Sequence, residues 1–337
     1  MTTIRDVAEW AQVSVGTVSR VMNGHPSVSP AIRRVVLEAI DELHYQPNAA
    51  ARTLRTAKTD TLGFLAVNMR NAEVAAAAIT GAEAAAQEHG YALFVANTRR
   101  DPSVQDQYLR NLLGRRVDGL LCPASMDLER VHQLVDQAGV PTVVFGQPKP
   151  FTLLPSTVLN FSAATEEAID DLRGLGHERI ATITHVSDAG LEESVAWGAS
   201  YIQNALRQRG IDGGDGYELI VQSTEECTRR VTELMARPDR PTALLVTPLY
   251  LVPATIAGIR TAEATIPADV SLIGFGDSSW AEIVEPPISV IAADLTAYLH
   301  ASTRLLIDLI NGGQIPDPPI EHHAHYIRRG SVMAARC

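Results

Sequence analysis

Hydroxyl, amide and guanidinium groups gather in one short stretch near the N-terminus, residues 14–23, which read SVGTVSRVMN. At helical spacing the apolar Val18, Val21 and Met22 fall on one side, and the opposite side carries small or polar residues. Ser14 stands where an N-cap is expected, because its hydroxyl can accept an amide hydrogen of the first turn. A helix face of hydroxyls, one Asn and one Arg is suited to bind phosphates and the edges of DNA bases.

A second short helix is predicted just before this stretch. Thr3 and Asp6 form a capping box, in which each side chain bonds to the backbone amide of the other. The helix is expected to run to about Ala11, and Gln12 and Val13 make a tight connector. Two short helices at this spacing predict a helix-turn-helix, whose second helix enters the DNA major groove. The alternative is an ordinary helical hairpin.

A third helix is predicted to begin at Ser29 and Pro30, with Ser29 as the cap and Pro30 at the first helical position. The apolar residues expected to close a three-helix core are Ile32, Val35, Val36, Ala39, Ile40 and Leu43, together with Val7, Ala8, Val13, Val18 and Val21. A core of this size is marginal by itself. We therefore expect the head to depend on DNA or on the rest of the protein for full order.

An Ala-rich run follows Pro47, and residues 48–54 could form a helix of two turns. Isolated helices this short are unstable in water, so the segment is expected to be helical only where a partner supports it. The apolar Leu54 lies between Arg52 and Arg55, an arrangement that suits insertion into the minor groove. A plain linker is the alternative.

Length and charge favour a small head on a larger body. The chain has 337 residues, enough for two or three domains, of which 46% are hydrophobic and 20% charged, as in ordinary soluble globular proteins. Residues 1–58 carry seven basic and five acidic side chains, so their net charge is +2. Because the whole chain has a net charge of −11, the remaining residues carry −13. This division favours a head that faces nucleic acid. Without a signal peptide, a long apolar stretch or clustered cysteines, the chain is expected to be cytoplasmic, with no membrane partner.

Several ordered motifs in the head resemble the lactose-repressor/galactose-repressor (LacI/GalR) family of bacterial transcription regulators. They are residues 3–8 (TIRDVA), 13–14 (VS), 17–21 (TVSRV), 23–24 (NG), 28–29 (VS), 43–48 (LHYQPN) and 51–52 (AR). Family-like stretches also occur in the body, at residues 117–119, 176–180, 240–243 and 266–275. The resemblance therefore covers essentially the full chain.

The body supports the same resemblance on its own pattern. From residue 62 onward, apolar strand-like segments alternate with helical ones, which predicts parallel sheets covered on both faces. The resemblance implies an α/β fold, with an all-α helix-turn-helix head and hinge helix before a two-lobed periplasmic-binding-protein-like body of doubly wound sheets. The expected parts are the head (1–46), the hinge helix and linker (47–60) and the effector-binding and dimerisation body (61–337). Its N-lobe is expected at about 61–160 and 292–320, and its C-lobe at about 161–291 and 321–330.

The resemblance implies that the second helix reads base edges from Val15, Gly16 and Arg20. Arg20 is the strongest candidate, because a guanidinium can pair bidentately with guanine. The full expected DNA-binding set is Thr3, Ser14, Val15, Gly16, Thr17, Ser19, Arg20, Asn23, Tyr45, Asn48, Ala51, Leu54 and Arg55. Thr17, Ser19, Asn23 and Tyr45 are expected at phosphates, and the last three residues of the set in the hinge helix. Two heads are needed for affinity, which predicts a homodimer on a near-palindromic DNA operator.

The family also implies a small-molecule effector between the lobes, but here the sequence departs from the family pattern. Asn160 and Phe161 stand where the family commonly has an Asp-Asn pair, and Trp197 stands where it has an Arg. Leu249 replaces an Asp or Asn, and Gly276 replaces the first Asp of a Phe-Asp-Asp motif. The expected cleft residues are Asn68, Asn71, Glu73, Ser125, Gln147, Asn160, Phe161, Trp197, Leu249, Tyr250 and Asp277. The losses predict an apolar or aromatic ligand, not a sugar, that stacks on Trp197 and Phe161. The alternative is a cleft that binds no small molecule.

Cofactors and catalysis are not expected. His323 and His325 share one face of a predicted strand, but two ligands without a cysteine pattern do not predict a metal site. The chain lacks a phosphate-binding loop, and no catalytic motif is recognisable. The sequence therefore predicts a DNA-binding regulator, most simply a repressor, and not an enzyme. A solute-binding receptor and an enzyme on a doubly wound fold are the alternatives from other classes.

Overall fold

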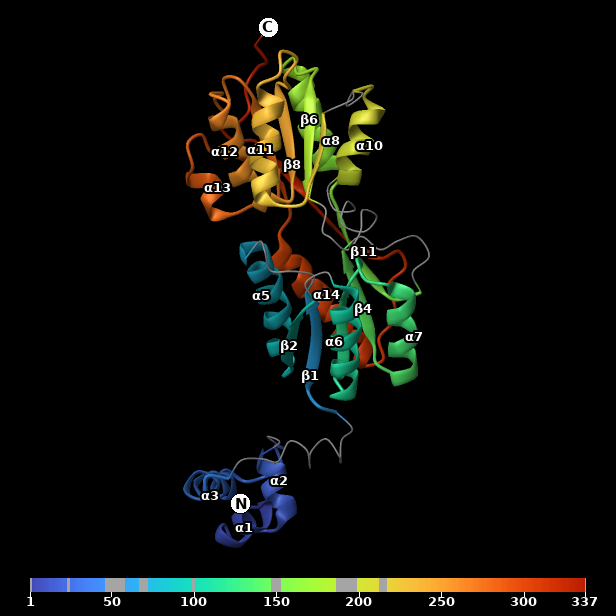
Figure 1. Cartoon of the computed structure of the whole chain (residues 1–337). Coiled ribbons are helices and arrows are strands. Elements are labelled where there is room, and N and C mark those ends of the chain that lie inside the picture. Colours follow the sequence, from blue (N-terminus) through green and yellow to red (C-terminus); the bar gives the residue numbers. More distant parts are fainter. Residues whose placement is uncertain are drawn as a thin grey trace. The chain divides into compact units, whose positions relative to one another are not determined.

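The computed structural model describes residues 2–22, 25–45, 58–66, 72–98, 101–146, 153–185, 199–211 and 217–336. Its contacts divide the chain into two compact units, Met1–Thr59 and Asp60–Cys337 (Figure 1). Nine of the expected site residues lie outside the described residues: Asn23, Asn48, Ala51, Leu54, Arg55, Asn68, Asn71, Gln147 and Trp197. Among the described residues, no helix combines the length and the apolar character needed to span a membrane.

The first unit is a head of three helices, α1 (Ile4–Trp10), α2 (Val15–Met22) and α3 (Pro30–Glu42). The predicted capping box of Thr3 and Asp6 is confirmed, as is the Ser29 cap of α3. Most of the predicted core residues pack together, but Ile32 does not belong to the core cluster. Ile32 is 39% exposed, because it lies in the first turn of α3 at the edge of this small core.

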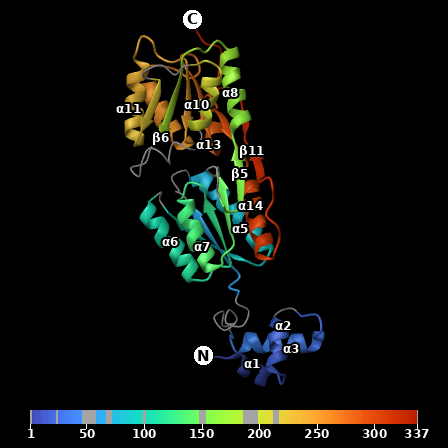
Figure 2. The ribbon, with the colours of Figure 1, turned by 90° about the vertical axis from the view of Figure 1, so that its right-hand side faces the viewer.

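The first lobe of the second unit is a parallel six-stranded sheet in the order β11-β5-β4-β3-β1-β2. Its strands are β1 (Thr61–Ala66), β2 (Ala92–Asn97), β3 (Gly119–Pro123), β4 (Thr142–Gly146), β5 (Ser156–Asn160) and β11 (Ile320–His323). Helices α5 (Ala72–Glu88) and α14 (Leu295–Ile310) cover one face, and α6 (Pro102–Gly114) and α7 (Leu128–Ala138) cover the other (Figure 2). Burial on both faces explains why these strands read as nearly continuous apolar runs.

The second lobe repeats this plan, with the strand order β12-β10-β9-β8-β6-β7. Its strands are β6 (Ile180–His185), β7 (Glu218–Val221), β8 (Ala243–Thr247), β9 (Ser271–Phe275), β10 (Ser289–Ala292) and β12 (His325–Ile327), and only β12 pairs antiparallel among the described strands. Its helices are α8 (Ser162–Gly174), α10 (Ala199–Gln208), α11 (Thr224–Met235), α12 (Val252–Thr261) and the short α13 (Ser279–Ile283), with a 3₁₀ turn η1 (Leu249–Leu251).

The chain crosses between the lobes after β5, after β10 and between β11 and β12. Residues 321–323 were expected in the second lobe, but they extend the first sheet, where Glu321 lies opposite Val158. The physical reason is the ladder that β11 forms with β5, which continues until the Ala324 amide bonds to the Asn160 carbonyl at 2.9 Å. The crossing therefore falls at Ala324.

Candidate DNA-binding head and interlobe cleft

The two faces of α2 differ as the sequence predicts. Val18 and Val21 are buried in the head core. Val15, Gly16 and Arg20 are exposed. Among the described residues, none forms a hydrogen bond or an ion pair with the exposed Arg20 guanidinium. Such a cation on a small-residue helix face can bind a base edge or a phosphate.

Hydroxyl groups at the start of the helices are engaged in capping. The Ser14 hydroxyl accepts the Thr17 amide at 3.1 Å, and the Ser14 and Thr17 hydroxyl oxygens lie 2.9 Å apart. The Thr3 hydroxyl accepts the Asp6 amide at the start of α1. These residues thus fix where the helices begin, whatever they contact on DNA.

Tyr45, which is expected at a phosphate, packs against the core of the head. The residue is only 9% exposed and packs in the core cluster of the head. Its amide bonds to the Ile40 carbonyl at 2.9 Å, which follows the end of α3. Tyr45 therefore contributes to the packing of the head.

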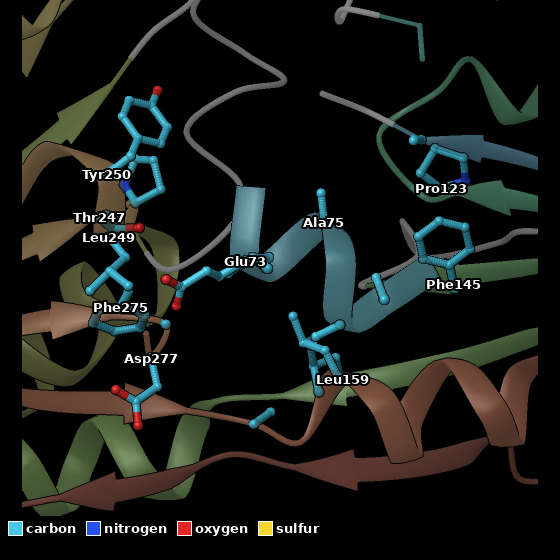
Figure 3. A pocket seen from close by; sticks show the side chains of 18 of the residues that line it. Glu73, Ala75, Pro123, Phe145, Leu159, Thr247, Leu249, Tyr250, Phe275 and Asp277 are labelled. Carbon is cyan, nitrogen blue, oxygen red and sulfur yellow. The ribbon is translucent and has the colours of Figure 1, made fainter. Parts of the chain in front are cut away.

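A cavity of about 540 Å³ opens between the two lobes of the body. Figure 3 shows Pro123 and Phe145 on one side of it, Thr247, Leu249 and Tyr250 on the other, and the start of α5 between them. The apolar lining residues include Phe64, Val74, Ile79, Phe145, Leu159, Phe161, Leu249, Phe275 and Leu295. Of the expected cleft residues, Glu73, Ser125, Phe161, Leu249, Tyr250 and Asp277 line the cavity.

Asn160 was expected in the cleft but is not among the residues that line the cavity. Its side-chain oxygen accepts the Ser162 amide at 2.9 Å at the start of α8, and its side-chain nitrogen donates to Glu321 at 3.4 Å. Short amides commonly bond to the backbone two residues on, and here that local bond turns the side chain to the start of the helix. Asn160 thus organises the lobe crossing.

The Asp277 carboxylate is held by an arginine from the C-terminal segment. The two terminal nitrogens of Arg329 donate to the two Asp277 oxygens at 2.8 and 2.7 Å, and one also donates to Glu282 at 2.9 Å. This pairing raises the pKa of the Arg329 guanidinium above its usual value. The Ser278 amide also donates to one Asp277 oxygen at 2.9 Å, so donors from the protein itself engage both oxygens of this carboxylate.

The Glu73 carboxylate reaches from α5 in the first lobe to α13 in the second. It accepts hydrogen bonds from the Ser278 hydroxyl, from the Ser279 amide at 2.9 Å and from the Ser279 hydroxyl at 3.1 Å. The Ser278 hydroxyl and the Ser279 amide hold the pKa of Glu73 below its usual value. Glu73 thus connects the lobes at the rim of the cavity.

Sequence reasoning missed much of the apolar lining, in particular Phe64, Phe145, Pro123 and Leu295. Phe64 and Phe145 stack with ring centroids 5.2 Å apart. The positions of Pro123 and Phe145 at strand ends could have identified them, because ligands of open α/β sheets bind beyond the carboxyl ends of the strands. Pro123 and Phe145 stand at the ends of β3 and β4, and the aromatic residues there define the character of the cavity.

Three family models match the chain. Residues 3–48 match "Bacterial regulatory proteins, lacI family", and residues 61–244 match "Periplasmic binding proteins and sugar binding domain of LacI family". Residues 169–332 match a periplasmic binding protein-like domain.

Individual relatives agree. The chain is 33% identical over 322 residues to the HTH-type transcriptional regulator CelR of Thermobifida fusca, with 92% of each chain covered. It is 30% identical over 312 residues to catabolite control protein A of Priestia megaterium, again with 92% of each covered. Among solved structures, the lac repressor dimer bound to operator and the anti-inducer ONPF has the same fold, with a TM-score of 0.85 at 24% identity over 99% of both chains.

A transcriptional regulator CelR–cellobiose complex superimposes with a TM-score of 0.71 at 27% identity, covering 98% of this chain and 100% of that one. These relatives are transcription regulators and not enzymes. The chain belongs to the lacI family of bacterial regulatory proteins and is itself a DNA-binding transcription regulator.

Proposed function

We propose that this chain is a dimeric repressor whose operator binding is controlled by a neutral, largely apolar molecule in the interlobe cavity. In functional terms we divide it into a reading head (1–46), a hinge (47–60) and an effector-binding and dimerisation body (61–337). The observation that carries the proposal is that the three acidic residues in the cavity lining, Glu73, Asp277 and Asp294, are all bonded to the protein itself.

The chemistry of the cavity supports an apolar ligand. A polyhydroxylated sugar exchanges its many hydrogen bonds with water for hydrogen bonds with the protein, so burial is costly where partners are missing. Four phenylalanine rings line the cavity and favour stacking and apolar contact: Phe64, Phe145, Phe161 and Phe275. A volume of about 540 Å³ lies in the range of small-molecule sites.

The DNA half of the proposal rests on α2. Its exposed Arg20, with Val15 and Gly16 at its first turn, is proposed to read base edges, and Thr17 and Ser19 to contact phosphates. One such short helix reads few bases. Specificity is therefore proposed to come also from the hinge residues Ala51, Leu54 and Arg55 and from the spacing of two heads.

The dimer is proposed to form through apolar surface that the body leaves exposed. Phe94 and Val95 are exposed on β2, the edge strand of the first sheet. Ile283 of α13 is exposed on the second lobe. An exposed edge strand with large apolar side chains is typical of a surface that another chain covers.

The effector half is tested by thermal unfolding of the full chain with 2-naphthol, indole or coumarin, and with cellobiose. We expect stabilisation by at least one neutral aromatic compound and none by cellobiose. Ala75→Phe, which places a ring in the cavity, should abolish the stabilisation. Ala76→Phe is the matched control, because Ala76 is exposed on α5 and does not line the cavity. Stabilisation by cellobiose alone would contradict an apolar cleft, and a response to no compound would favour an effector-independent regulator.

The DNA half is tested with duplexes that the wild-type protein retains from a random-sequence pool. We expect a salt-sensitive complex that prefers the retained sequence over a scrambled duplex of equal length. The aromatic compound that stabilises the body should change that affinity. Equal affinity for both duplexes would overturn the role proposed for the head.

A further inference from the structure

The C-terminal end of α2 is held by a side chain from α3. One terminal nitrogen of Arg33 donates to the Val21 carbonyl at 3.4 Å, and the other donates to the His25 carbonyl at 2.8 Å. The His25 amide in turn donates to the Arg20 carbonyl at 2.9 Å. One guanidinium thus joins the last turn of α2 to the turn that follows it.

This arrangement has a clear physical effect on the helix. The last carbonyl groups of an α-helix lack partners within the helix and carry a partial negative charge. A guanidinium at that end supplies both hydrogen-bond donors and positive charge. Because its donors form a rigid planar fork, Arg33 fixes two carbonyls relative to each other, which the single ammonium of a lysine does not do.

We propose that Arg33 is a positioning residue for DNA reading: it fixes the end of α2 and thereby the direction from which Arg20 approaches a base. Arg20 directly precedes Val21, whose carbonyl Arg33 binds, and its own carbonyl is bonded to the His25 amide. A bidentate contact with a base tolerates little displacement of the side chain. This inference rests on the proposed role of α2 as the reading helix.

Arg34 provides a matched control within the same helix. Its side chain is 77% exposed and forms a 3.6 Å ion pair with Glu38. Removing Arg34 therefore removes the same charge from the head, one residue away, and leaves the Arg33 contacts with α2 in place. If the charge matters only through attraction to phosphates, removal of either arginine should lower DNA affinity equally. If Arg33 positions α2, only its removal should lower the preference for the retained sequence.

The experiment measures the affinity of the full chain for the retained duplex and for the scrambled duplex, as a function of salt. Arg33→Gln should lower the ratio of the two affinities about tenfold, because the base contact is lost and the phosphate attraction remains. Arg34→Gln should leave the ratio unchanged and lower both affinities slightly. Arg33→Lys, which keeps the charge but loses the fork, should fall between wild type and Arg33→Gln; its retained binding to the scrambled duplex reports a folded head.

A double-mutant cycle shows whether Arg33 acts through Arg20. On an Arg20→Ala background, Arg33→Gln should cause no further loss of the ratio, since the contact that it positions is already absent. Amide hydrogen exchange of residues 20–22 in the DNA-free protein should be faster in Arg33→Gln and unchanged in Arg34→Gln.

The outcomes separate this inference from the proposed function. Equal effects of Arg33→Gln and Arg34→Gln on both duplexes would overturn the positioning role in favour of bulk charge. If Arg20→Ala lowers the ratio and Arg33→Gln does not, the inference fails while the role of α2 stands. If neither changes the ratio, the proposed reading helix and the inference both fail.

Discussion

The Asp277 carboxylate is engaged by an arginine that is distant in sequence. The motif that contains it places a carboxylate at the end of β9, where a ligand could reach it. Arg329, which lies 52 positions further along the chain, engages both of its oxygens. The Arg329 guanidinium also donates to the Ile288 carbonyl at 3.0 Å, so that it joins the rim of the cavity to the second sheet.

This pair predicts an unequal effect of two neighbouring substitutions. Arg329→Met should lower the free energy of unfolding of the body by about 2 kcal/mol, because it leaves Asp277 without its partner in a half-buried site. The Arg329 side chain is only 12% exposed, whereas that of Arg328, paired with Asp171 at 3.2 Å, is 48% exposed. Arg328→Met should therefore cost less than about 1 kcal/mol. Urea unfolding measures both, and equal losses would contradict the account of Arg329.

Glu73 gives the cavity rim a dependence on pH. Its pKa is held below the usual value by the Ser278 hydroxyl and the Ser279 amide. Because the folded pKa is depressed, the stabilisation is present above the unfolded pKa, about 4.3, and is lost as pH falls through the folded pKa. Asp277, Arg329 and Glu282 are the other charged groups near α13.

The pH effect is followed by the fluorescence of Trp280 on α13, in a chain that also carries Trp10→Phe and Trp197→Phe. The emission should change as the pH falls below the usual titration range of a glutamate and α13 separates from α5. Glu73→Gln should abolish this change, and Glu282→Gln is the control that should retain it. An unchanged titration in Glu73→Gln would assign the transition to another group.

At the scale of elements, α5 and α14 approach closely at one glycine. A Cβ built on Gly81 of α5 would lie 2.1 Å from the Thr296 carbonyl oxygen of α14. A backbone atom cannot move aside as a flexible side chain does, so the two helices would have to separate. The cavity is lined from the same two helices, by Ala78 and Leu295 among others.

Gly81→Ala should accordingly destabilise the body by about 2 kcal/mol, a typical cost of overpacking. Gly114→Ala is the control: a Cβ there meets nothing within 4 Å, and alanine stabilises a helix by up to about 1 kcal/mol relative to glycine. Chemical unfolding distinguishes the two. A neutral Gly81→Ala would mean that α14 can shift without cost.

Elements with a strong apolar pattern are predicted correctly, whereas some elements without one are not. The strand–helix alternation expected from residue 62 onward is found in both lobes, because burial of the sheets on both faces leaves a strong local pattern. The five-residue α13 was missed, and the strand expected to hold both His323 and His325 is two strands in different sheets, β11 and β12. Residues 320–323 read IEHH, which carries no continuous apolar signal, and only pairing with β5 makes them a strand.

At the scale of the whole molecule, the proposed dimer predicts that one exposed edge controls DNA affinity. Phe94 of β2 is 45% exposed, and Phe94→Glu should place a charge in the contact between two copies. We expect a monomer in sedimentation experiments and a loss of operator affinity of about 100-fold, because the second head no longer binds from the same complex. Tyr108→Glu, on the exposed surface of α6, is the control. A Phe94→Glu protein that stays dimeric would place the interface elsewhere.

The sequence alone determined the family, the helical head and the strand–helix alternation of the body. Each of these depends on local signals: the Thr3 and Ser29 caps, the apolar spacing in α2, and apolar runs at regular intervals. The same signals correctly indicated a body with two doubly wound sheets.

Only the tertiary structure decided what the candidate sites offer to a ligand. It brought Arg329 to Asp277 and, across 205 positions, Ser278 to Glu73, so that both carboxylates are satisfied. It placed Tyr45 in the head core and turned Asn160 to the start of α8. Whether a polar group is free to bind a ligand depends on hydrogen-bond partners that are distant in sequence. A local sequence pattern predicts the element on which a side chain lies, but not the residues that it contacts.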